Sequence, residues 1–141
     1  MPREPQFGTP AEWFRRAKSN LIRAQQPRLE GVCWEDLCFD AQQAVEKALK
    51  ALLVHCNLPF RHVHDIAELL TLLEQGGVSL PEDVRLAAGL SDYAVAAQYP
   101  GPMESVTEEE YQEAIALAAT TLQWVEQQLQ RKQNPPDGIN S

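Results

Sequence analysis

The stretch "CFDAQQAVEKALKALLVHC", Cys38–Cys56, decides the fold. It contains neither proline nor glycine, and its small and aliphatic residues recur at spacings of three and four, so it predicts a helix from about Trp34 to Cys56. The sequence "NLP" that follows, residues 57–59, is expected to end this helix. Its apolar stripe comprises Leu37, Ala41, Ala44, Val45, Ala48, Leu49 and Leu52.

The opposite side of this helix is not purely polar. At 100° per residue Phe39 and Leu53 fall on that side, and a solvated face does not require them. We therefore expect a second contact face, covered by a second chain or by the fourth helix. As a homodimer face we hypothesise Phe39, Gln43, Glu46, Lys50 and Leu53.

Glu46 and Lys50 are spaced i,i+4 and can pair on that face. The simplest interpretation is a surface ion pair that adds only a few tenths of a kcal/mol. The alternative is a polar cluster of Gln43, Lys47 and Lys50 beside a groove. Spacing alone leaves both interpretations open.

Further helices are expected on both sides of the central one. A capping box at Thr9–Glu12 opens the first helix, and Pro27 ends it. Asp65 can cap a short helix that ends at Gly76-Gly77, and another helix is expected from Pro81 to Ala97. Thr107 and Glu110 form a second capping box, and Tyr111, Ala114, Ile115, Ala118, Leu122, Val125 and Leu129 keep a 3.6-residue period.

These segments predict an all-α fold, an up-and-down four-helix bundle with an additional short helix. The domain is expected to span residues 9–132, after an extension at residues 1–8 and before a disordered tail at residues 133–141. The N-terminus lacks the apolar core of a secretory signal, and no apolar run is long enough to span a bilayer. We expect a cytoplasmic protein without a membrane association.

Charge is unevenly distributed along the chain. The net charge is −8, which disfavours general binding to DNA. Residues 1–28 carry +4, however, and the remainder carries −12. The basic first helix could dock phosphate or an acidic partner, or it could complement the acidic surface of the same domain.

Two longer segments, "FDAQQAVEKALKALLVHCNLPFRHVHDIAELL" and "LSDYAVAAQYPG", together resemble the HEPN family (higher eukaryotes and prokaryotes nucleotide-binding domain). The resemblance covers roughly residues 10–130. It implies a bundle of four or five helices that is usually a homodimer. It also implies a minimal nucleotidyltransferase as partner, in a two-component or toxin–antitoxin system.

Many HEPN proteins are ribonucleases with an Arg-x4–6-His motif, and this motif is absent from the sequence. Gln98 also stands where members of the similar subgroup commonly have arginine, which weakens any phosphate site there. We therefore expect no catalytic residues. The alternative is a ribonuclease toxin with a non-standard site that pairs His64 with Arg61 or Arg85.

The hypothesis that follows is a non-catalytic, homodimeric module that binds a nucleotide-like ligand, a nucleotidyltransferase partner, or both. Its candidate ligand-binding residues are Gln43, Lys47, Lys50, His64, Tyr93 and Tyr99. The two tyrosines could stack on a base. His55 is expected in the core or at a helix end, and His62 at the surface. The spacing of the histidines and of Cys33, Cys38 and Cys56 matches no standard zinc site, so no metal or cofactor is expected.

Overall fold

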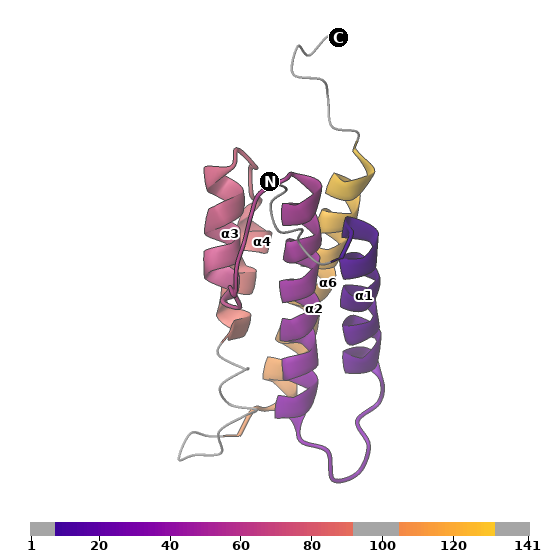
Figure 1. Ribbon diagram of the computed structural model, residues 1–141. Coiled ribbons are helices and arrows are strands. Elements are labelled where there is room, and N and C mark those ends of the chain that lie inside the picture. Colours follow the sequence, from indigo (N-terminus) through magenta and orange to yellow (C-terminus); the bar gives the residue numbers. More distant parts are fainter. Residues whose placement is uncertain (1–7, 92–104, 132–141) are drawn as a thin grey trace, which may run out of the picture.

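In the computed structural model, which describes residues 8–91 and 105–131, three long helices stand side by side (Figure 1). They are α1 (Pro10–Gln25), α2 (Trp34–His55) and α6 (Glu108–Gln130). On the other side of α2 lie α3 (Ile66–Gln75), α4 (Glu82–Arg85) and the 3-10 helix η1 (Leu86–Leu90). The described residues form helices and turns but no strand, which confirms the all-α class.

The central helix is α2, which packs against α1, α3 and α6. Its alanines at positions 41, 44, 48 and 51 are completely buried and let the neighbouring backbones approach closely. None of the helices in the described ranges is both long and apolar enough to cross a membrane.

Local sequence sets the helix boundaries. The Thr9 hydroxyl accepts a hydrogen bond from the backbone amide of Glu12 at 3.1 Å, and Pro10 occupies the first turn of α1. Asp65 caps α3 in the same way through the amide of Ala67. At α6 both halves of the predicted capping box form between Thr107 and Glu110. The predicted starts of these three helices are thereby confirmed.

The helices α2 and α3 end in the same type of turn. The amide of Leu58 donates to the carbonyl of Leu53 at 2.9 Å, and that of Val78 donates to Leu73 at 3.0 Å. In each turn one residue takes a positive φ, Asn57 at 59° and Gly77 at 96°, as a Schellman motif requires. Both turns therefore satisfy terminal carbonyl groups that would otherwise face the solvent.

Within the described residues, the helix predicted from Pro81 to Ala97 is not one continuous α-helix. The α-helix ends at Arg85, and a 3-10 helix continues to Leu90. Val84, Ala87 and Leu90 are buried at spacings of three, which matches the three-residue turn of a 3-10 helix better than a 3.6-residue period. Residues 92–104 lie outside the described part of the chain, so the predictions for Tyr93, Gln98 and Tyr99 lie outside it as well.

The second contact face of α2 exists, but the chain itself covers much of it. Leu53 is completely buried, and Glu46 and Lys50 are nearly so, without any second copy present. Of the two covers expected for this face, a second chain or the fourth helix, a second chain is not needed to bury these three side chains. Phe39 and Gln43 are half-buried, and their contribution to a homodimer stays a prediction.

Candidate functional site

A buried carboxylate organises the polar side of α2. Oε2 of Glu46 lies 2.8 Å from Nζ of Lys50 and 2.8 Å from Nδ1 of His64. Its Oε1 accepts from the side-chain amides of Gln42 at 3.2 Å and Gln43 at 3.4 Å. A carboxylate inside a bundle is costly unless its lone pairs are occupied, and here four donors surround it.

Lys50 is enclosed by this cluster and by two aromatic rings. Its side chain is 7% exposed, and its Nζ lies 5.6 Å from the Trp13 ring centre and 5.7 Å from that of Phe60. The two rings themselves meet edge to face at 6.2 Å. These contacts favour the ammonium ion through cation–π attraction while excluding water from it. The pair with Glu46 is thus buried, and the surface ion pair interpretation is wrong.

His64 links this interior cluster to the solvent. It precedes the N-cap of α3, its side chain is 72% exposed, and only its Nδ1 edge faces Glu46. An ionised carboxylate can only accept hydrogen bonds, so the 2.8 Å contact with Glu46 requires a proton on Nδ1, although the ammonium of Lys50 also lies 3.5 Å from this nitrogen. In the neutral ring Nε2 is then left as a hydrogen-bond acceptor.

A second polar network joins α1 to α2. Arg23 donates to both carboxylate oxygens of Asp40, at 3.0 and 2.7 Å. Asn20, which is buried, donates to Asp40 at 3.2 Å and accepts from Nζ of Lys47 at 2.8 Å. The bidentate contact and the charge of Asp40 raise the pKa of Arg23.

Lys47 lies among other cations. Its pKa is lowered first by desolvation and then by the nearby charges of Arg16 and Arg23, although Glu46 and Asp40 oppose this effect. Arg16 and Arg15 both approach a single carboxylate, that of Glu12, at 3.9 and 2.9 Å. The surface above Lys47 therefore holds more positive than negative charge, which makes it suited to bind an anion.

The structure brings together four of the predicted ligand-binding residues, Gln43, Lys47, Lys50 and His64. It adds five that the sequence analysis did not single out, namely Trp13, Arg16, Asn20, Arg23 and Asp40. Four of these five, Trp13, Arg16, Asn20 and Arg23, lie three or four residues apart on the first helix. Residues at this spacing share one face of a helix, so the sequence could have indicated that these four lie together.

The remaining predicted features lie elsewhere. His55 is in the last turn of α2, partly buried, as expected for a helix-end histidine. His62 is exposed, as predicted. Burial raises the pKa of Cys38 to about 12, with smaller contributions from the charges of Glu35 and Glu110, so this thiol stays protonated at neutral pH. Among the residues that the structure describes, no group of three or more His, Cys, Asp or Glu side chains could hold a metal ion.

Comparison with known proteins identifies the family. A model of the HEPN domain matches residues 10–128. The crystal structure of TT1696 from Thermus thermophilus is similar, with a TM-score of 0.72 and 34% identity over 84% of this chain and 96% of that one. The archaeal HEPN homologue ST0689 superposes with a TM-score of 0.70 and 27% identity, over 88% of this chain and all of the other. A search of curated proteins found no match. The helical fold and the match over most of its length show that this chain belongs to the HEPN domain family.

Proposed function

We propose that the chain is a non-catalytic HEPN module that binds an anionic, nucleotide-like ligand over the surface between α1 and α2. In this proposal it acts as a homodimer together with a minimal nucleotidyltransferase, in a two-component or toxin–antitoxin system. The ligand part rests on the polar face of α2, and the assembly part rests on membership of the HEPN family.

The crowding of cations around Lys47 is the observation that carries the ligand proposal. Desolvation and then the charges of Arg16 and Arg23 lower the pKa of Lys47, and the carboxylates of Glu46 and Asp40 offset only part of this effect. A phosphate group placed between Arg16 and Lys47 would relieve the repulsion between these cations and gain charge-assisted hydrogen bonds. Such a site can exist on a protein of net charge −8 because the positive charge is concentrated on the first helix.

The predicted ligand-binding residues then take different roles. His64 is exposed, and Lys47 and Gln43 are half-buried, whereas Lys50 is enclosed and holds Glu46. We assign Lys47 to the anionic group and the Nε2 atom of His64 to a hydroxyl or amino donor of the ligand. Lys50 positions these groups through Glu46 without contacting the ligand. Tyr93 and Tyr99 remain candidates for stacking on the base.

Calorimetric titration with ATP and AMP tests the ligand part. We expect saturable binding that Arg16→Ala and Lys47→Ala each weaken about tenfold, the effect of losing one charge-assisted contact. Lys18→Ala is the matched control, because Lys18 is an exposed cation of the same helix that lies over the Phe14 ring. No heat at millimolar nucleotide, or equal losses in all three variants, would remove the proposal.

The assembly part is tested separately. Light scattering after size-exclusion chromatography should give twice the mass of the 15.8 kDa chain. Phe39→Ser, on the half-buried part of the predicted dimer face, should shift the protein towards the monomer. A wild-type monomer at micromolar concentration would contradict the homodimer. Co-purification from native extract, followed by mass spectrometry, would identify the nucleotidyltransferase partner.

A ribonuclease with a non-standard site is the second candidate, and the pair of Glu46 and His64 favours it. A carboxylate that fixes the tautomer of an exposed imidazole is the arrangement of a general base. Of the two arginines suggested as partners, Arg85 forms an ion pair with Glu74 of α3. RNA decay by the purified protein that is lost in His64→Asn and retained in His62→Asn would support this candidate over a binding module.

A further inference from the structure

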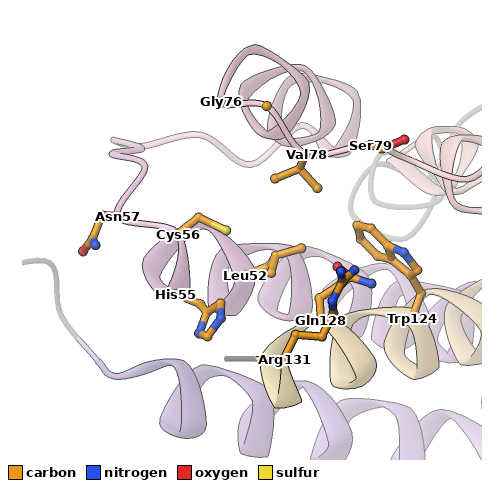
Figure 2. Close-up of a pocket in the computed structure, with 11 residues that line it drawn as sticks. Leu52, His55, Cys56, Asn57, Gly76, Val78, Ser79, Trp124, Gln128 and Arg131 are labelled. Atoms are coloured by element: carbon orange, nitrogen blue, oxygen red, sulfur yellow. The ribbon is translucent and has the colours of Figure 1, made fainter. Parts of the chain in front are cut away.

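An open cleft of about 870 Å³ lies on another side of the molecule, where α2, α3 and α6 end (Figure 2). The residues that cap these three helix ends, Cys56, Gly76 and Arg131, all line it. Its volume is within the range of small-molecule sites in proteins. It is separate from the Lys47 surface, since the lining residues at the end of α2 are Leu52, His55 and the cap residue Cys56.

The cleft combines an aromatic wall with a polar rim. Trp124 of α6 is partly buried, and Figure 2 shows its ring across the cleft from Val78 and Ser79 of the turn after α3. Leu52 extends the apolar surface, and His55, Asn57 and Gln128 supply hydrogen-bonding groups. Such a surface suits a planar ring that is polar at one end.

Two glycines in the lining, Gly76 and Gly77, leave part of one wall of the cleft without side chains. Gly77 has a φ of 96°, and a side chain added there would meet nothing within 4 Å. A Cβ on Gly76 would lie 2.4 Å from the Leu58 side chain, which would have to shift to make room for it. At Gly76 and Gly77 the turn therefore contributes backbone to the wall, and Val78 and Ser79 that follow contribute side chains.

The charge of the lining residues differs from that of the whole chain. The protein has twenty acidic residues, yet none is among the eleven described residues that line the cleft. Arg131, at the end of α6, is the one lining residue among them with a permanent charge. The net charge of the lining side chains is therefore positive, and it is concentrated at Arg131.

The helix ends limit where an anion can lie. A helix C-terminus carries partial negative charge, and three such ends meet at this cleft. In the Schellman turns of α2 and α3, backbone amides donate hydrogen bonds to the terminal carbonyls. The partial negative charge of each helix end nevertheless remains. The acidic group is thus best placed at Arg131, with the ring of the ligand directed inward against Trp124.

We infer that this cleft is a second small-molecule site, which takes a planar aromatic ring carrying one carboxylate or phosphate group. The ring packs on Trp124 and the acidic group pairs with Arg131. Burial raises the pKa of the Cys56 thiol at the edge of the cleft, which disfavours the nucleophilic thiolate. The inference does not depend on the anion site at Lys47.

Nuclear magnetic resonance of the tryptophan indole N–H groups tests this inference on the full chain. The protein has three tryptophans, and the signal missing in Trp124→Phe is that of Trp124. We expect 2-naphthoate and 1-naphthyl phosphate to shift this signal saturably at millimolar concentration, and their relative affinities distinguish a carboxylate from a phosphate ligand. Neutral 2-naphthalenemethanol and non-aromatic cyclohexanecarboxylate should bind much more weakly.

Three variants complete the test. Arg131→Gln should weaken binding of both aromatic anions about tenfold, whereas Arg61→Gln, at an exposed arginine outside the lining, should leave it unchanged. Lys47→Ala should also leave it unchanged, which separates this site from the proposed nucleotide site. An unshifted Trp124 signal, equal binding of either control compound, or unchanged affinity in Arg131→Gln would each overturn the inference.

Discussion

Nδ1 of His64 lies 2.8 Å from Oε2 of Glu46, a residue that precedes it by 18 positions and belongs to a different element. This contact joins a largely exposed ring to a carboxylate that is almost completely buried. Lys50 neutralises the same carboxylate oxygen from inside the bundle. The polar face of α2 is thus held by one interior ion pair, and His64 is the side chain that extends it to the surface.

Glu46→Gln should destabilise the protein strongly, because it leaves the Lys50 ammonium buried without its counterion. Breaking one partner of a buried pair costs about 3–5 kcal/mol. Equilibrium unfolding in urea measures this loss. Glu12→Gln, which removes an exposed carboxylate beside Arg15, is the matched control and should change stability by less than about 1 kcal/mol.

The double variant Glu46→Gln, Lys50→Met should recover much of that stability, because the unpaired charge is then gone. If the double variant were as unstable as Glu46→Gln alone, the loss would come from packing rather than from the buried charge.

The tautomer of His64 can be observed directly. The contact with Glu46 requires Nδ1–H, so the neutral ring should show a protonated Nδ1 and a bare Nε2 in long-range ¹H–¹⁵N correlation spectra. His62 is also exposed and is the internal control, expected to show the mixture of tautomers typical of a solvated imidazole. Glu46→Gln should abolish the preference at His64, and a bare Nδ1 in the wild type would contradict the described hydrogen bond.

Periodicity and capping were sufficient to predict most of the fold. The Thr9, Asp65 and Thr107 caps and the apolar stripe of α2 are local signals, and the structure confirms each of them. The end of α4 was missed because burial at Val84, Ala87 and Leu90 repeats every three residues, whereas a 3.6-residue helix was assumed.

The candidate site was harder to predict because its key contacts are not local. Glu46 and Lys50 were expected to pair, but their burial depends on Trp13 of α1 and Phe60 of the turn before α3. Helical spacing places a residue on a face, yet it does not reveal which distant segment covers that face. The same limit applied to Leu53, for which the sequence left open whether a second chain or the fourth helix covers it.

Alkaline pH should destabilise the wild type more than Cys38→Ala. The native state keeps the Cys38 thiol protonated up to about pH 12, whereas the unfolded chain releases this proton near the ordinary value of 9.0. The unfolded state therefore binds fewer protons between these two values, and the stability contributed by this thiol is present below about pH 9 and lost as pH rises. At pH 10.5 the wild type should have lost about 2 kcal/mol more than Cys38→Ala, measured by urea unfolding relative to pH 8. Cys33→Ala, at an exposed cysteine, should follow the wild type.

Gly76→Ala should destabilise the protein by about 1–3 kcal/mol, because the new methyl group would lie 2.4 Å from the Leu58 side chain and must displace it. Leu58 belongs to the turn that ends α2, so the displacement loosens the contact between the ends of α2 and α3. Gly89→Ala is the matched control: no atom lies within 4 Å of its added Cβ and its φ is not positive, so it should be neutral or slightly stabilising. Thermal unfolding of both variants compares the two positions. If Gly76→Ala and Gly89→Ala were equally stable, Leu58 would move aside without cost. The close approach at Gly76 would then not stabilise the contact between the ends of α2 and α3.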